Sequence, residues 1–524
     1  MNCNTQDASN YLRTEPRIWL IKRQLEAILS LVDLEKNGEP VKVDGFRLKN
    51  LSQWVDCNSS LYTNLGAVSG YCNCDCVFCY EKGNPLPFSK EFISLEEVKT
   101  RIKYYSHDKK KGLPTPARFS LEPFLHPHFL DILKLIRESD ANSLLWITTN
   151  GGLLTEDIIK ELSCLQPILL CVSLNSADPS IRNKVMRETP EQTMTAINSI
   201  PLLKQYTIFF IGSIVAWPLI PLSDFVKTIE FFDRHDARAI RVLLPGYSQY
   251  FADEQLFDTD TVWQDIVRTV REVREKIKTP ITCQPGFYWN EPLIPIVDGV
   301  MKRSPAAQSG VKPGDKILTI NDQPVYTRVH AAKVLSDRYH DGCCRLLVLR
   351  KGKKIIISLE ETDTGINCYP YKVKGMPPLG SDFGIFFIDD FKLSYIQDLI
   401  TLIEEHNAYN VVLLSSKIMK PVVEKAIDMV KDFKEYFSTK NLAIHVPPHG
   451  FWGGNILLGD LYTVRDYTDY LTALLSTGST PDLVVIPISS MSQWDYDLAN
   501  GPFADIKHKI AIPVAFLRCD PIFY

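Results

Sequence analysis

Four cysteines crowd into eight positions of this chain, at Cys72, Cys74, Cys76 and Cys79. The remaining nine of the 13 cysteines are scattered along the 524 residues. Scattered cysteines are most often small buried hydrophobic side chains. The first, third and fourth cysteines of the crowded group have the spacing C-x3-C-x2-C. Three thiolates on one loop can hold a four-iron cluster and leave one iron open, and an open iron can bind a small molecule through an amine and a carboxylate.

A structural zinc site is the alternative for these cysteines, because Cys74 supplies a fourth thiolate. The Cys-x-Cys-x-Cys run would strain a tetrahedron built from one short loop, and no second Cys or His pair follows nearby. The spacing therefore favours an iron–sulfur cluster held by Cys72, Cys76 and Cys79, with Cys74 as a bystander.

Alternating strand and helix patterns between about residues 61 and 290 predict the framework that positions the cysteines. Six short apolar runs, among them LLWITTN, ILLCVSLN and AIRVLLP, alternate with amphipathic patterns such as HFLDILKLIRESD. Repeated strand–helix units indicate a parallel sheet, which carries its chemistry at the C-terminal ends of its strands. We therefore predict an α/β fold with a partial (βα)6 barrel of the TIM type over residues 59–290, after a helical preface over residues 1–58.

Two further domains are predicted after the barrel. Residues 291–361 are dense in Gly, Pro and Asp, and RLLVLRKGKKIIISLE predicts two strands around a Lys-Gly turn. This pattern indicates a small β-rich domain. Residues 362–524 return to an α/β pattern, with strands expected at FGIFFIDD, NVVLLSS and DLVVIPIS among others.

The cysteine motif and the order of the predicted strand ends resemble the radical S-adenosylmethionine (SAM) superfamily. The resemblance implies that Cys72, Cys76 and Cys79 bind a 4Fe-4S cluster, which in turn binds SAM. It also implies that Phe78, just before the last cysteine, lies where the backbone approaches the adenine of SAM.

A second motif of that superfamily, Gly-Gly-Glu-Pro-like, ends the second strand and meets the SAM amino group. The matching stretch here is FSLEPFLHP, in which Glu122 and Pro123 match but Ser120 and Leu121 replace the two glycines. The alternative for Glu122 is an ordinary carboxylate at a helix start.

The resemblance continues at the next two strand ends. Asn150 follows the predicted third strand in ITTNGG, and Ser173 and Asn175 follow the fourth in CVSLNS, where they would face the ribose or the methionine carboxylate. His126 and His128 could form a metal pair, but the sequence LHPH favours two residues that flank a proline turn.

The β-rich domain resembles a bacterial-type PDZ domain, through RSPAAQSGVKPGDKILTINDQPV. Such domains bind C-terminal peptides by strand addition. The carboxylate-binding loop is expected just upstream, where PLIPIVDGVMKR has no clear match, so peptide capture and a spacer role both stay open.

The last residues resemble a C-terminal domain of unknown function found in bacterial proteins that combine PDZ and radical SAM segments. Its loop FWGGN, with Gly453 and Gly454, could hold an anion or a planar ligand near exposed backbone N–H groups. The alternative is a tight turn that needs positive φ angles.

Together the resemblances imply an enzyme that takes one electron from a flavodoxin- or ferredoxin-like donor. It would cleave SAM to methionine and a 5′-deoxyadenosyl radical, and this radical would abstract hydrogen from a substrate. A peptide or protein, reached through the PDZ-like domain, and a small metabolite are both open as substrates. The alternative is an iron–sulfur scaffold that binds a partner without turnover, which the replaced glycines favour.

Composition excludes several other classes of protein. The formal net charge is −4, from 58 Lys and Arg against 62 Asp and Glu, and no long basic block indicates general nucleic-acid binding. No apolar run approaches the ~18 residues needed to span a bilayer, so a transmembrane protein is excluded and a peripheral one is not, and we expect no membrane partner. The N-terminus has no apolar core of signal-peptide length, so we expect a cytoplasmic protein.

Overall fold

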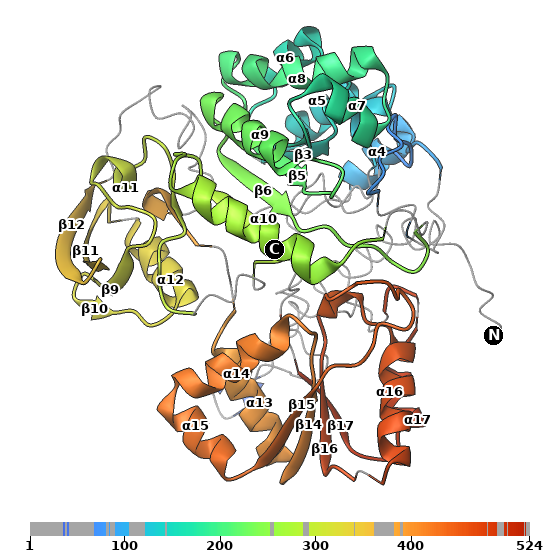
Figure 1. Ribbon diagram of the computed structural model, residues 1–524, viewed down its shortest axis with the longest axis vertical. Helices are drawn as coiled ribbons and strands as arrows, with labels where there is room; N and C mark the ends of the chain where they lie inside the picture. Colours follow the sequence, from blue (N-terminus) through green and yellow to red (C-terminus); the bar gives the residue numbers. More distant parts are fainter. Residues whose placement is uncertain are drawn as a thin grey trace. The chain divides into compact units, whose positions relative to one another are not determined.

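The structure of the protein is a computed structural model (Figure 1). It describes residues 35–36, 39–40, 68–79, 83, 90–103, 121–141, 144–251, 256–286, 293–339, 341–360, 382–387, 391–478, 480–489, 497–499, 501–517 and 519. Most of the predicted helical preface lies outside these residues. Two short antiparallel strands, β1 (Glu35–Lys36) and β2 (Glu39–Pro40), are its described part.

The chain divides into two compact units, which are described separately. The first contains residues 1–77 and 86–213, and the second contains residues 78–85 and 214–524. The cysteine loop is therefore shared between them, with Cys79 in the second unit. In the part of the chain that the structure describes, no helix is both long and apolar enough to cross a membrane.

The first unit alternates helices with parallel strands. β3 (Leu145–Thr149), β4 (Ile168–Ser173) and β5 (Phe209–Val215) pair in parallel, and β4 is almost wholly buried, as the inner strand of a parallel sheet must be. The helices of this unit are α4 (Leu95–Lys103), η2 (Pro123–Leu125), α5 (Phe129–Ser139), α6 (Glu156–Ser163), α7 (Pro179–Met186) and α8 (Pro190–Gln205).

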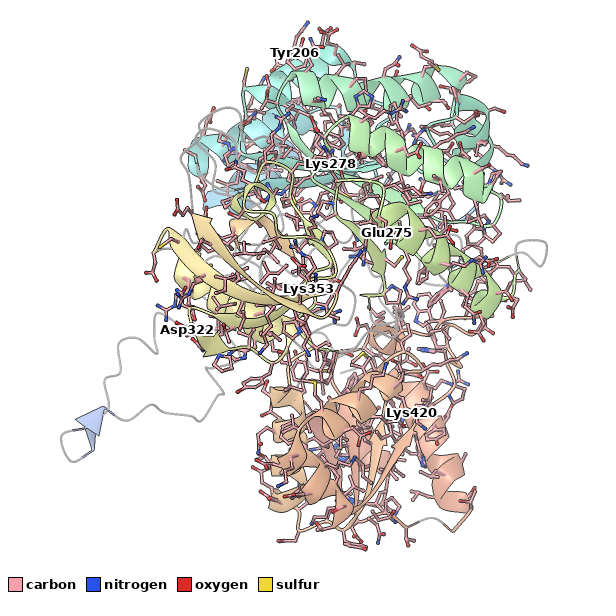
Figure 2. The ribbon with its side chains drawn as sticks, turned by 60° about the vertical axis from the view of Figure 1, so that its left-hand side comes forward. Tyr206, Glu275, Lys278, Asp322, Lys353 and Lys420 are labelled. Atoms are coloured by element: carbon pink, nitrogen blue, oxygen red, sulfur yellow. The ribbon has the colours of Figure 1, made fainter. Side chains whose placement is uncertain are left out.

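Side-chain caps fix where several of these helices begin. Thr155 caps α6, Asp178 caps α7, and Thr189 forms a capping box with Gln192 at the start of α8. Tyr206, labelled in Figure 2, ends α8 and donates to the Glu156 carboxylate at the start of α6, over 2.6 Å. The caps of α6 and α7 start these two helices a few residues after β3 and β4, which leaves those strand ends available for a site.

The second unit contains the rest of the barrel. Its elements are α9 (Leu222–Arg234), β6 (Ala239–Leu243), α10 (Thr259–Arg274) and β7 (Ile281–Gln284), and the five strands have the order β3-β4-β5-β6-β7. The predicted α/β partial barrel is confirmed. β7 was not predicted, since its four residues are too short to show a period, and the strands expected at NLGAVSG and ARFSLE lie largely outside the described residues.

The PDZ-like region follows in the same unit. Its strands are β8 (Gly299–Val300), β9 (Lys316–Ile320), β10 (Gln323–Pro324), β11 (Cys343–Arg350) and β12 (Lys353–Glu360), and its helices are α11 (Pro305–Gln308) and α12 (Arg328–Tyr339). The predicted hairpin is present: β11 and β12 pair in antiparallel across Lys351 and Gly352, whose φ angles are 46° and 79°.

A later segment completes this region. η6 (Asp382–Gly384) leads into β13 (Ile385–Phe386), which pairs in antiparallel with β8, and Phe383 and Ile385 lie in the core formed by β9, α12 and β11. The strand expected at FGIFFIDD therefore exists, but the expectation that it belongs to the C-terminal sheet is wrong. Its run of apolar residues predicts a strand, whereas the choice of β8 as its partner depends on tertiary packing.

The C-terminal sheet has the order β15-β14-β16-β17 and is parallel throughout. Its strands are β14 (Asn410–Leu414), β15 (Asn441–His445), β16 (Leu483–Pro487) and β17 (Val514–Leu517), and its helices are α13 (Ser394–Glu405), α14 (Met419–Met429), α15 (Lys431–Ser438), η7 (Gly459–Leu461), α16 (Val464–Ser476) and α17 (Ala504–Lys509). One apolar core lies under α13 and α14 and another under α16 and α17, on opposite faces of the sheet (Figure 1).

Candidate active site

The cysteine loop runs along the end of α7 in the first unit. The backbone N–H of Asp75 donates to Met186 over 3.0 Å, and that of Val77 donates to Val185 over 2.9 Å. Cys72 is exposed and Cys76 is half-buried, and neither forms a disulfide. Two backbone bonds therefore fix the loop while its sulfur atoms stay accessible.

Two thiols of the loop contact different partners. The Sγ of Cys74 donates to the carboxylate of Glu188 over 3.3 Å, and the Sγ of Cys76 donates to the sulfur of Met186 over 3.7 Å. Hydrogen bonds with Cys72 and Cys76, together with burial, raise the pKa of the Cys74 thiol above its ordinary value. The bystander role of Cys74 stays a prediction.

The donor set fits a cluster better than a single ion. Among the described residues, no group of three or more His, Cys, Asp or Glu side chains gathers around one point as a metal ion requires. A zinc ion needs four ligand atoms about 2.0–2.3 Å from its centre. Each cysteine of an iron–sulfur cube binds a different iron, so its thiols need not converge. The loop supplies three cysteines of the kind that such a cluster binds, at Cys72, Cys76 and Cys79.

Glu122 is a completely buried carboxyl group that directly precedes η2 and contacts the end of β3. It accepts hydrogen bonds from the Thr149 hydroxyl over 2.9 Å and from the Asn150 backbone N–H over 2.8 Å. Burial raises the pKa of Glu122 to about 8, against the opposing effect of these donors. Glu122 also accepts from the backbone N–H of Phe124 and so caps η2, which means that the predicted alternative of a helix-start carboxylate describes part of its role.

Asn150 joins this carboxyl group to the cysteine loop. Its Nδ2 donates to Asn73 over 2.7 Å and lies 3.8 Å from the Cys72 sulfur, while its Oδ1 accepts from Gly152. Among the described residues, Nδ2 of Asn73 is a buried donor with no hydrogen-bond partner. Three residues predicted for the site, Cys72, Glu122 and Asn150, thus meet in one network that also holds an unused donor.

Ser173 and Asn175 lie at the end of β4. Asn175 is buried with a φ of 62°, and its Nδ2 donates to the Ser173 carbonyl over 3.3 Å and to the Met186 sulfur over 3.0 Å. Ser173 is half-buried and pairs in register with Ser213 of β5. In the second unit, Phe78 lies 6.3 Å from the ring centre of Trp217, with the planes at 50°.

Other predicted residues have structural roles or lie outside the description. His126 uses both ring nitrogens within the protein, on the Ile93 carbonyl and the His128 N–H, so the proline-turn prediction is supported over a metal pair. Leu121 donates its backbone N–H to the Ser69 carbonyl over 3.2 Å. Ser120 lies outside the described residues.

An ion pair missed by the sequence reasoning lies beneath this network. Both side chains of Arg182 and Glu188 are fully buried, and Nε and Oε1 are 2.6 Å apart. The Arg182 guanidinium also donates to the carbonyls of Asn150, Ser173 and Leu174. Arg182 therefore connects the ends of β3 and β4. Glu188 connects the same pair to the cysteine loop, because it accepts a hydrogen bond from Cys74.

Comparison with known families identifies two parts of the chain. Residues 67–232 match the radical SAM superfamily, and residues 296–350 match a PDZ domain. The chain thus contains a radical SAM domain and a PDZ domain. Neither match extends beyond residue 350, so the resemblance of the last residues to a domain of unknown function stays a prediction.

Individual proteins resemble shorter stretches. The magnetosome formation protease MamE of Magnetospirillum gryphiswaldense is 32% identical over 90 residues, which are 17% of this chain and 12% of that protein. Streptococcus suis SuiB bound to the precursor peptide SuiA is 13% identical with a TM-score of 0.34, covering 54% of this chain and 64% of SuiB. The structure of anSMEcpe with bound AdoMet is 17% identical with a TM-score of 0.32, covering 40% of this chain and 58% of anSMEcpe. The chain spans less than two thirds of each of these three proteins.

Proposed function

We propose that this enzyme binds a 4Fe-4S cluster through Cys72, Cys76 and Cys79 and uses it to activate SAM. The observation that carries the proposal is the network that joins Cys72, Asn150 and Glu122 within the matched residues 67–232. When bound and reduced by a flavodoxin- or ferredoxin-like donor, the cluster supplies the electron that cleaves SAM to methionine and a 5′-deoxyadenosyl radical. That radical then abstracts hydrogen from the substrate.

The residues of the chain orient SAM and protect it from water. Glu122 accepts a hydrogen bond from the SAM ammonium, and Asn150 and Asn73 hold the cysteine loop beside it. Ser173 faces the ribose or the methionine carboxylate. Asn175 contacts the same part of SAM. Phe78 lies at the adenine.

Anaerobic reconstitution with iron and sulfide tests the metal part of this proposal. We expect about four irons per chain and a broad absorption from sulfur-to-iron charge transfer near ~400 nm. Alanine at Cys72, Cys76 or Cys79 should remove most of both signals, whereas Cys74→Ala and the exposed control Cys164→Ala should retain them. A full complement of zinc without iron after anaerobic purification contradicts the proposal.

We propose a peptide or protein, rather than a small metabolite, as the partner of the PDZ domain. Support comes from β13, which pairs in antiparallel with β8 inside the upstream sequence PLIPIVDGVMKR. The carbonyls of Gly384 and Phe386 accept hydrogen bonds from Met301 and Asp298 beside β8. Because backbone groups alternate in direction along a strand, those of Ile385 point to the other edge, where an added peptide could pair.

Fluorescence anisotropy with a pool of labelled peptides tests this partner. Peptides with a free C-terminal carboxylate should bind and their amidated versions should not. The variant Ile356→Asp, on an exposed position of β12, is the control and should bind normally. Equal binding of free and amidated peptides, or no binding by any of them, contradicts the proposal.

We propose the cytoplasm, because the described cysteines form no disulfides, as is usual in a reducing compartment.

A further inference from the structure

Within the second unit, a loop of the C-terminal domain lies against the loop that follows β6. We call residues 449–455 the glycine loop and residues 245–251 the β6 loop. Asn455 binds Tyr247 twice: its backbone N–H donates to the Tyr247 carbonyl over 3.0 Å, and its Oδ1 accepts from the Tyr247 N–H over 2.6 Å. Gln249 donates its backbone N–H to the Trp452 carbonyl over 2.8 Å. The two loops are therefore joined through their backbones.

The glycines of the glycine loop permit this close approach. Gly453 and Gly454 have φ angles of 58° and 61°. A Cβ on Gly454 would overlap the carbonyl oxygen of Tyr247, and a Cβ on Gly453 would lie 2.9 Å from the Cβ of Gln249. Neither position tolerates a side chain while the loops stay in contact.

The glycine loop has already used several of the N–H groups that an anion would need. Gly450, Phe451, Gly453 and Asn455 donate to Pro448, Asp466, His449 and Tyr247 respectively. The positive φ angles fit the turn alternative of the sequence analysis, and the turn serves to contact another part of the chain. The structure does not favour the predicted anion site.

The β6 loop in turn holds the segment that follows the cluster cysteines. The buried Ser248 donates its hydroxyl to the Gly83 carbonyl over 2.6 Å, and a Cβ on Gly83 would overlap the ring of Phe251. The rings of Phe251 and Trp217 stack with their centres 6.1 Å apart. The ring centres of Phe78 and Trp217 are 6.3 Å apart, and Phe78 directly precedes Cys79 in the sequence. Cys79 thus lies between two residues, Phe78 and Gly83, that the β6 loop and Trp217 hold in place.

We propose that the C-terminal domain is a positioning element of the cluster site. Its glycine loop fixes the β6 loop. The β6 loop in turn fixes Gly83 through Ser248 and Phe78 through Trp217, on either side of Cys79. This inference rests on the proposed function, because it takes Cys79 as a cluster ligand. It assigns a role to residues that lie about 370 positions away from the cysteines in the sequence.

A matched pair of glycine variants tests the proposal. Gly454→Ala and Gly478→Ala both place a side chain at a positive φ in the C-terminal domain, but a Cβ on Gly478 would meet no atom within 4 Å. Both variants should lose similar stability from backbone strain, which thermal unfolding measures. Only Gly454→Ala should also separate the glycine loop from the β6 loop.

Hydrogen–deuterium exchange of the full-length protein without added iron is the first readout, and iron bound after reconstitution is the second. In Gly454→Ala, peptides covering residues 78–85 should exchange at least about tenfold faster, because their local opening costs less free energy. Iron content should fall to less than about half. Gly478→Ala should match the wild type in both.

Slow exchange at residues 78–85 together with full iron content in Gly454→Ala would overturn the positioning role. If Gly454→Ala fails to fold, Asn455→Ala is the second variant, because it introduces no backbone strain. It should show the same faster exchange to a smaller extent, and wild-type exchange in Asn455→Ala would also overturn the positioning role. The exchange readout separates this inference from the proposed function: a wild type that binds no iron contradicts the cluster, whereas unchanged exchange in the variants contradicts the positioning.

Discussion

The guanidinium of Arg182 and the carboxylate of Glu188 form an ion pair in which both side chains are fully buried and the nearest atoms are 2.6 Å apart. The remaining donors of Arg182 bind the carbonyls of Asn150, Ser173 and Leu174. The pair therefore joins the ends of β3 and β4, where SAM contacts are proposed. Glu188 also accepts a hydrogen bond from Cys74, which lies between the proposed cluster ligands Cys72 and Cys76.

Breaking this pair should destabilise the first unit strongly. Arg182→Met leaves the Glu188 carboxylate buried without its counterion, which typically costs about 3–5 kcal/mol. Thermal or denaturant unfolding measures the loss. Lys160→Met removes only exposed ion pairs and should cost less than about 1 kcal/mol. Equal stability of the two variants would show that the pair does not hold the strand ends.

Glu122→Gln should weaken SAM binding while the iron content stays normal. Losing a charge-assisted hydrogen bond to the SAM ammonium costs about 1.5–3 kcal/mol, or roughly tenfold or more in affinity. The variant amide would also present a donor to Thr149 or Asn150, so a lower unfolding temperature is expected. Equilibrium dialysis with labelled SAM measures the affinity, and the exposed Glu161→Gln is the control. Unchanged SAM affinity would limit Glu122 to capping η2.

Stability should fall as the pH is lowered toward 4, in part because of His449. Its ring stacks on Tyr462 at 3.8 Å, and burial lowers its pKa from the ordinary 6.5 to about 4. The unfolded chain therefore takes up the proton first, so this contribution is complete above pH 6.5 and is lost as the pH falls through the window to about 4. At pH 5 the loss should be roughly 2 kcal/mol.

Unfolding of the wild type and of His449→Phe at pH 7.5 and 5.0 measures this effect. The aromatic replacement keeps the stacked ring but has no proton to bind, so its pH dependence should be smaller by about the same 2 kcal/mol. Identical pH dependence in the two proteins would show that His449 does not titrate in this window.

Local patterns predicted the features that depend on local chemistry. The C-x3-C-x2-C spacing and the Lys-Gly hairpin at residues 351–352 are defined within a few residues. The meeting of Glu122 with Asn150 also followed from sequence, because both were expected at strand ends and parallel strands gather their C-terminal ends at one edge.

Long-range packing produced the features that the sequence did not reveal. Arg182 and Glu188 resemble ordinary exposed charges in RNKVMRETP, and only the packing of α7 against the ends of β3 and β4 buries them. The strand β8, with which β13 pairs, lies about 85 positions earlier in the chain. Nothing in the sequence of β13 indicates that it pairs with β8 and not with another strand. The glycines of FWGGN predicted a turn, while their contact with Tyr247 depends on how the second unit folds.

The most direct test of the central claim is the yield of 5′-deoxyadenosine from SAM. Full-length protein, reconstituted anaerobically and reduced with dithionite, should form 5′-deoxyadenosine and methionine in equal amounts even without added substrate. The Cys72→Ala variant should form neither, and the exposed control Cys164→Ala should match the wild type. A wild-type protein that holds its full complement of iron and binds SAM but forms no 5′-deoxyadenosine above the level of Cys72→Ala would contradict the account.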